Sequence, residues 1–147
     1  MLKRRVILGG LAGLAATRSG LLAGAARAQT RPVAADLRGA FDASEAGVVP
    51  GAADNQSRKL QALIEAAARR GQPVYLPAGT YEVSNLDLPD GTRLLGDQGA
   101  TRLAYSGDGH LISARDVHHV SLSGITLDGA NRWLADYTQA LVSFRSV

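Results

Sequence analysis

The 147-residue sequence predicts a mainly β chain that winds as a solenoid behind a single amphipathic helix. Downstream of Leu76, apolar residues come in short runs with a period of two, as in strands that bury one face. Similar phrases recur at about two dozen residues, and Leu103 and Leu127, for example, lie 24 positions apart. This spacing is about one coil of a β-solenoid, in which neighbouring coils bury one another's apolar faces.

The helix is predicted over residues 57–71. Its apolar residues recur with helical spacing and define one stripe, formed by Leu60, Leu63, Ile64, Ala67 and Ala68. Ser57 is well placed as the N-cap, with Asp54 or Asn55 as alternatives, and Gly71 is expected at the C′ position. Because the first coil of a solenoid would otherwise expose its apolar end, we expect the helix to cover it.

Residues 72–147 are predicted to form the first coils. The strand 74–76 lies between Pro73 and Pro77, which suit the ends of a strand because proline has no backbone N–H. An up-and-down barrel or a sandwich is the alternative architecture. The recurrence at about two dozen residues and the lack of two-residue hairpin signals argue against it.

Three phrases carry a resemblance to a known family. They are the P-x-G-x-Y phrase at 77–81, the L-x-L-x-x-G-x-x-L-x-G phrase at 86–96, and the V-x-x-V-x-L-x-G-I-T-L-D-G phrase at 117–129. Together with the preceding helix they resemble the pectate-lyase-like superfamily over roughly residues 36–130. The resemblance implies a right-handed parallel β-helix with an N-terminal capping α-helix. With the twin arginines described below, the chain looks most like the twin-arginine-translocated, uncharacterised repeat branch of that superfamily.

Residues 1–28 have the three-part pattern of an export signal peptide. Arg4 and Arg5 precede a Gly- and Ala-rich, weakly hydrophobic stretch, and small residues at Ala26 and Ala28 place cleavage before Gln29. Adjacent arginines before such a stretch are typical of the twin-arginine route, and the Sec route stays open. Localisation is therefore predicted to be periplasmic or extracellular.

A retained membrane anchor is the alternative interpretation of this leader. Arg18 would lie near the centre of any span, which costs about 2.5–3.5 kcal/mol on insertion scales. We therefore expect no stable membrane span after signal cleavage. Residues 29–56 are predicted to form a linker and an N-terminal cap segment.

The charge distribution disfavours nucleic acid as a partner. The formal net charge is +3, but residues 1–28 hold five of the 16 basic residues and none of the 13 acidic ones. The remainder therefore has 11 basic and 13 acidic residues, a net charge of about −2. It contains no stripe of basic residues interleaved with aromatics. The chain has no cysteine, which excludes disulfides and thiolate chemistry.

Histidines and aspartates are the residues in which a metal site would be sought, namely His110, His118, His119, Asp108, Asp116 and Asp128. Their spacing matches no strong metal signature, and adjacent histidines on a strand point to opposite faces. We therefore predict no metal site and interpret the histidines as solvent-facing strand or turn residues.

Acid–base chemistry needs carboxylates that are paired in space. The available residues are separated along the chain and show no such pairing: Asp97, Asp108, Asp116, Asp128 and Arg132. No catalytic motif of the resembling enzymes matches this sequence, so the catalytic residues are unknown. No cofactor is evident, and calcium is implied only by the family resemblance.

The function predicted first is that of an exported β-helix repeat protein of unassigned activity, with this chain supplying the N-terminal cap and the first coils. The alternative is the N-terminal part of a polysaccharide lyase or glycoside hydrolase of pectate-lyase-like type. A second alternative is a noncatalytic carbohydrate-binding or envelope protein. Both alternatives make a polysaccharide the expected partner.

The final residues, 141–147, resemble the start of another strand and not a cap. The β-helix is therefore expected to be truncated at its C-terminal end, as the N-terminal portion of a longer protein. An uncovered coil presents apolar side chains and unpaired backbone groups. Self-association through this open coil is thus a further expectation.

Overall fold

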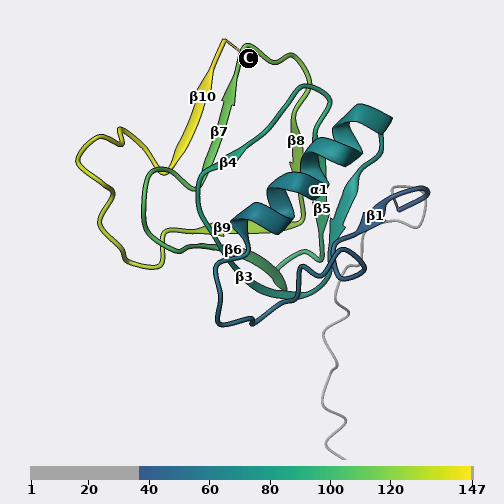
Figure 1. The fold of residues 1–147 in the computed structure, drawn as a ribbon, viewed down its shortest axis with the longest axis horizontal. Coiled ribbons are helices and arrows are strands. Elements are labelled where there is room, and N and C mark those ends of the chain that lie inside the picture. The colour runs from purple at the N-terminus through teal and green to yellow at the C-terminus, as the bar shows by residue number, and fades with distance from the viewer. Residues whose placement is uncertain (1–36, 147) are drawn as a thin grey trace, which may run out of the picture.

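The computed structural model describes residues 37–146, which form a mainly β fold with three sheets and one helix. Every strand pair among these residues is parallel. Seen along the direction in which the strands stack, the three sheets form the sides of a triangle and the helix lies across it (Figure 1). This parallel pairing is consistent with a pectate-lyase-like β-helix and differs from the antiparallel pairing of an up-and-down barrel.

Each sheet takes one strand from every turn of the chain. The first sheet has the order β1 (Phe41–Asp42), β2 (Val74–Leu76), β5 (Arg93–Gly96) and β8 (Ser121–Ser123). The second has the order β3 (Gly79–Val83), β6 (Thr101–Tyr105) and β9 (Ile125–Asp128). The third contains β4 (Leu86–Asp87), β7 (Ile112–Arg115) and β10 (Val142–Arg145). From β2 onward, three consecutive strands therefore make one coil.

Equivalent positions of successive coils lie side by side. Tyr81 pairs with Leu103, and Leu103 pairs with Leu127, so the spacing of 24 residues seen in the sequence is the strand register of this sheet. Leu94 and Ile112 hold inward positions on the other two sheets and are fully buried. These inward rows form one apolar core, in which each fully buried large side chain stabilises the fold by about 1.5–3 kcal/mol.

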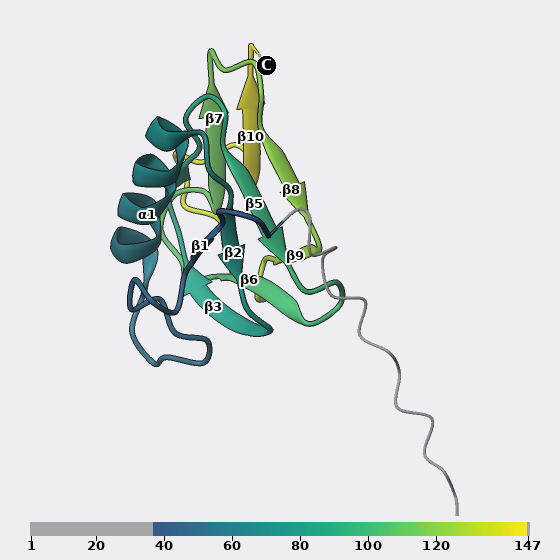
Figure 2. The same ribbon diagram turned by 90° about the vertical axis from the view of Figure 1, so that its right-hand side faces the viewer.

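The helix α1 (Ser57–Arg70) covers the core at the end formed by the first coil (Figure 2). It packs against β2 and β4. The side chains that it buries are four of the five predicted for the apolar stripe, namely Leu60, Leu63, Ile64 and Ala67. The helix ends at Gly71, whose φ of 63° is left-handed, as expected of a C-terminal glycine.

The predicted N-cap is wrong by one residue, because the N-cap is Gln56 and Ser57 is already helical. The Ser57 hydroxyl accepts a hydrogen bond from the Ser84 N–H at 2.7 Å, while the Ser57 N–H donates to Asn55 Oδ1 at 2.9 Å. The Gln56 side chain is buried and bonds the backbone N–H and carbonyl of Val49. The N-terminal end of the helix is thus held by the local bond to Asn55 and by contacts of Ser57 and Gln56 with other segments.

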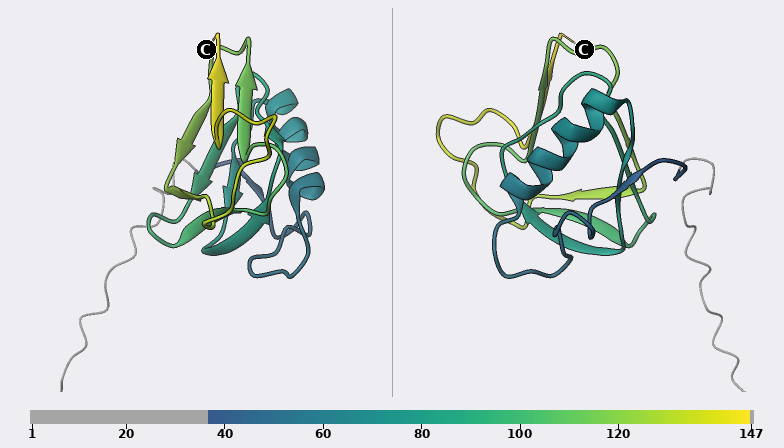
Figure 3. Two further views of the ribbon diagram at one scale, coloured as in Figure 1. Left: turned by 90° about the vertical axis from the view of Figure 1, so that its left-hand side faces the viewer. Right: turned by 45° about the vertical axis from the view of Figure 1, so that its right-hand side comes forward.

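The last coil is less covered than the one before it. Leu103 is fully buried, whereas its partner Leu127 is 36% exposed; Ala114 is fully buried, whereas its partner Phe144 is 48% exposed. Within residues 37–146, no further strand pairs with the outer edges of β8, β9 and β10. Figure 3 shows this coil and α1 on opposite sides of the intervening strands.

The predictions for the leader concern residues outside the described range, including Arg4, Arg5, Ala26, Ala28 and Gln29. They stay predictions. For residues 37–146, none of the helical structure has the length and apolar character that a membrane span requires.

Gly124 lies between β8 and β9 and tests how closely the coils stack. A Cβ atom there would lie 2.1 Å from the Gly96 carbonyl oxygen, and the φ of Gly124 is 70°. We expect Gly124→Ala to lower the free energy of unfolding by about 2–5 kcal/mol, because left-handed strain and a backbone clash add. Urea unfolding followed by circular dichroism measures this loss.

Gly99→Ala is the matched control, because Gly99 has a φ of 74° and no atom within 4 Å of its added Cβ. This substitution should cost only the conformational strain, about 1–2 kcal/mol. Equal losses for the two variants would contradict a close contact between the coils at Gly124.

Candidate functional site

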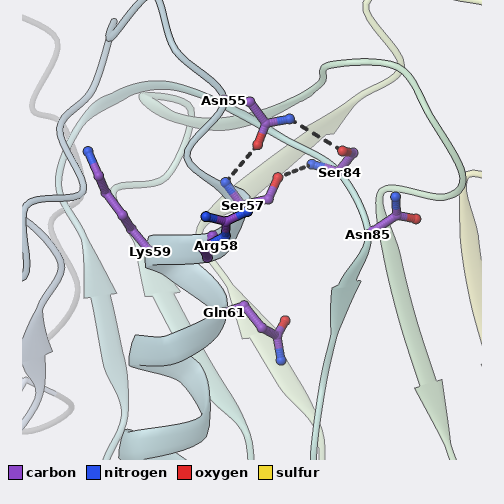
Figure 4. A pocket seen from close by; sticks show the side chains of 7 residues that line it. All are labelled: Asn55, Ser57, Arg58, Lys59, Gln61, Ser84 and Asn85. Carbon is purple, nitrogen blue, oxygen red and sulfur yellow. Dashed lines mark hydrogen bonds between the residues drawn. The ribbon is translucent and has the colours of Figure 1, made fainter.

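A cavity of about 660 Å³ lies where α1 meets the first coil, lined by Asn55, Ser57, Arg58, Lys59, Gln61, Ser84 and Asn85 (Figure 4). Its polar groups are largely engaged with one another and with the coil. The Asn55 amide donates to Ser106 Oγ at 2.6 Å, and Gln61 bonds both the N–H and the carbonyl of Asp87. These bonds attach the helix to the coils, so we assign this cavity a structural role.

A second cavity, of about 330 Å³, lies between the β7–β10 part of the third sheet and the loop that joins β9 to β10. It is lined by Asn85, Gly109, His110, Ser113, Arg115, Tyr137, Thr138, Gln139, Ala140, Ser143 and Arg145. This lining has two arginines and a histidine, and the nearby carboxylates of Asp108 and Asp87 accept hydrogen bonds from its Tyr137 and Ser113 hydroxyls. We call it the cationic cleft, and its volume lies within the range of small-ligand sites.

Strand register brings the two arginines of the cleft together. Arg115 on β7 pairs with Arg145 on β10, and parallel strands lie about 4.8 Å apart. Arg145 Nη2 donates to Gln139 Oε1 at 2.9 Å, which orients its guanidinium group. Among the described residues, neither arginine belongs to an ion pair. Because adjacent like charges repel each other, this row favours an anionic ligand.

Tyr137 forms one wall of the cleft. Its hydroxyl donates to Asp108 Oδ1, and this hydrogen bond is the main reason that the pKa of the Tyr137 phenol is raised. Asn85 Nδ2 donates to the Asp108 carbonyl at 3.1 Å. Asp108 and Asn85 both have positive φ, 76° and 53° respectively. Asn and Asp adopt this left-handed conformation more readily than other non-glycine residues.

The structure separates the three histidines. His110 lies in the cationic cleft, between β6 and β7. His118 and His119 lie between β7 and β8, and their backbone N–H groups donate to Asp90 Oδ1 at 2.8 and 2.9 Å. These two hydrogen bonds lower the pKa of the Asp90 carboxyl. The pair therefore belongs to a turn that Asp90 stabilises.

The aspartates considered from the sequence are also dispersed. Asp97 is buried and accepts a hydrogen bond from the Tyr75 hydroxyl at 3.0 Å. Asp128 pairs with Arg102 at 2.6 Å, and its pKa is lowered first by the N–H of Ala130 and then by Arg102. Asp116 follows β7, and Arg132 follows β9 outside the cleft lining.

No three His, Cys, Asp or Glu side chains within residues 37–146 lie together in a way that could hold a metal ion. The calcium that the family resemblance implies therefore finds no carboxylate set in this part of the chain. We derive no chemical step through it.

Sequence reasoning missed Arg115, Tyr137, Gln139 and Arg145 as site residues. A signal for the arginines is present, because the segments 112–115 and 142–145 both follow the order apolar, Ser, apolar, Arg. In strands that stack in register, such a repeated phrase places its arginines side by side. The tyrosine and the glutamine have no comparable signal, since they lie in an irregular loop.

The Tyr137–Asp108 contact makes the titration of Tyr137 testable. We expect Asp108→Asn to lower the pKa of the Tyr137 phenol toward 10.0, because the negative charge that favours the neutral phenol is removed. The contact stabilises the fold below the ordinary phenol pKa and is lost as the pH rises through the raised one. Ultraviolet titration measures the shift, with Tyr137→Phe identifying the signal.

Tyr81 serves as an internal control for that titration. Burial raises its pKa to about 12, and its hydroxyl bonds the Pro77 carbonyl, not Asp108. Its titration should therefore not change in Asp108→Asn. An unchanged Tyr137 titration in the variant would contradict the contact.

Comparison with known proteins identifies a family. A family model described as rhamnogalacturonase A/epimerase, pectate lyase-like, matches residues 40–136, more than half of the chain. No curated protein and no solved structure matches this sequence. The matched region contains the helix, the three parallel sheets as far as β9, and the phrases at 77–81 and 117–129. The chain therefore belongs to the rhamnogalacturonase A/epimerase, pectate lyase-like family.

Proposed function

We propose that this protein is an exported, right-handed parallel β-helix protein whose cationic cleft binds an acidic polysaccharide. The observation that carries the binding proposal is the register pair Arg115–Arg145, because neither guanidinium group has an ion-pair partner among the described residues. Family membership supports the same ligand class, because rhamnogalacturonan and pectate, to which the family's description refers, are polysaccharides that bear carboxylates.

The cleft has the groups that such a ligand needs. A guanidinium group binds a carboxylate through two parallel hydrogen bonds, and two of them lie on adjacent strands. A bound carboxylate also offsets the repulsion between the arginines. Thr138, Ser143 and His110 add hydroxyl and imidazole groups that can bond sugar hydroxyls.

Binding is better supported than hydrolysis. A glycoside hydrolase needs two carboxyl groups on either side of the scissile bond, and the lining of the cationic cleft has none. A lyase or hydrolase of pectate-lyase-like type is the second candidate, which the family match favours. For this candidate, the acid and base must come from residues outside 37–146 or from outside the cleft.

Export is proposed from the leader sequence alone. Arg4 and Arg5, with the small residues at Ala26 and Ala28, support twin-arginine translocation and cleavage before Gln29. They also support a place in the twin-arginine-translocated repeat branch of the superfamily. Self-association through the last coil stays a prediction.

The arginine pair can be tested by binding. We expect Arg115→Gln and Arg145→Gln each to weaken binding of polygalacturonate about tenfold or more, because each removes a charge-assisted hydrogen bond. Added salt should weaken binding by the unaltered protein as well. Isothermal titration calorimetry measures these affinities.

Arg58→Gln is the matched control, since it removes the same charge from the cavity beside α1. Its affinity should equal that of the unaltered protein. If Arg58→Gln weakens binding and the cleft variants do not, the ligand belongs in the other cavity and the proposed site is wrong.

The export proposal has a separate test. We expect replacement of both Arg4 and Arg5 by Lys to block processing, because the twin-arginine route requires the arginine pair. Cell fractionation and N-terminal sequencing of the secreted protein measure the outcome, with Gln29 expected as the first residue. Lys3→Arg is the control that leaves the pair intact. Continued export of the double variant would assign the protein to the Sec route.

A further inference from the structure

The loop between β9 and β10, residues 129–141, carries an aromatic residue that does not line the cationic cleft. Trp133 is 96% exposed and is the one tryptophan of the whole sequence. It lines a separate cavity of about 600 Å³ together with Gly129, Asn131, Arg132 and Leu134. A single exposed apolar residue needs no explanation by itself, so its surroundings decide what it does.

The backbone that presents Trp133 is held from both sides. On the β9 side, Asp128 accepts the N–H of Ala130 at 2.8 Å and pairs with Arg102 at 2.6 Å. Leu134, on the other side, packs against the hydrophobic core. Trp133 is therefore exposed on a turn that is anchored to the coils, which reduces the entropy that a ligand would have to offset.

The turn is also strained. Ala130 and Asn131 both have a φ of 51°, a left-handed conformation that Asn adopts readily but that costs Ala130 about 1–2 kcal/mol. The bonds to Asp128, and one from the Arg132 N–H to the Gly129 carbonyl at 3.0 Å, hold it in place. Strain that is maintained in this way directly before an exposed tryptophan indicates that the position of the ring matters.

The chemistry around the ring suits a sugar. The indole offers an apolar face for the C–H groups of a pyranose ring, while Asn131 and Arg132 offer hydrogen bonds to its hydroxyls. Apart from Leu134, the other lining residues are polar or glycine. A docking surface for a hydrophobic protein partner would need a larger apolar patch.

Continuity with the cleft identifies the ligand. The same loop supplies Tyr137, Thr138 and Gln139 to the cationic cleft, so the two cavities lie on one loop. We infer that Trp133 forms a stacking subsite for a further pyranose ring of the polysaccharide whose carboxylate binds Arg115 and Arg145. This inference rests on the proposed function, and it adds a requirement for a ligand longer than one sugar.

Because the chain has one tryptophan, its fluorescence reports on this position alone. We expect polygalacturonate to shift the emission maximum of Trp133 to shorter wavelength, and galacturonic acid, whose single ring is expected to occupy only the arginine site, to leave it unchanged. Calorimetry with both ligands measures binding independently of the fluorescence. The full chain is used throughout.

Variants separate stacking from folding. Trp133→Ala should weaken polygalacturonate binding about three- to tenfold and leave galacturonic acid binding unchanged. Trp133→Tyr should restore most of the lost affinity, because it retains an aromatic face. Val49→Ala is the matched control, since Val49 is also exposed but lies in the segment before α1.

The outcomes distinguish the two proposals. Binding of both ligands, with unchanged emission and full affinity in Trp133→Ala, overturns the stacking subsite and leaves the proposed function standing. Failure of both ligands to bind overturns both. An emission shift that follows protein concentration without sugar overturns the subsite as well, because it assigns Trp133 to a contact between copies of the chain.

Discussion

The structure depends on one constraint, the in-register stacking of parallel strands. Because each strand pairs with its equivalent in the next coil, one inward position defines a row that runs through the whole stack, such as Tyr81, Leu103 and Leu127. A polar side chain in such a row would face the core of the neighbouring coil. The inward rows are accordingly mostly apolar, and the buried Thr101 among them has its hydroxyl hydrogen-bonded to the Leu76 carbonyl. The helix α1 with its buried stripe continues these rows at one end.

The same constraint also aligns the outward-facing side chains, whose identity is not limited by packing in the core. Ser113 pairs with Ser143, and Arg115 pairs with Arg145. Identical residues that lie 30 positions apart in the sequence are therefore neighbours in the sheet. The connection that differs most between coils is the one that precedes the third strand of each coil. It has two residues before β4, six before β7 and 13 before β10. The longest of these connections, residues 129–141, lies beside the outward face of β7 and β10, and the cationic cleft lies between them.

The difference between the regular inward rows and the irregular connections explains which features could be predicted from the sequence. The helix and the mainly β fold follow from local periodicity, and the spacing of 24 residues between Leu103 and Leu127 predicts the register of the second sheet. Arg115 and Arg145 lie 30 residues apart, since the long loop before β10 intervenes, so a search for a period of about two dozen residues passes over them. The N-cap was mispredicted because Ser84, distant in the chain, takes the Ser57 hydroxyl.

The family match and the candidate site overlap only in part. The matched residues end at 136, whereas Tyr137, Gln139, Ser143 and Arg145 all follow that position. The part that identifies the family is therefore the part that builds the cap and the first coils, and half of the cleft lies beyond it. Membership accordingly supports a pectate-lyase-like, mainly β fold. The proposed ligand rests instead on the arginine pair and on the loop beside it, because a fold does not determine a function.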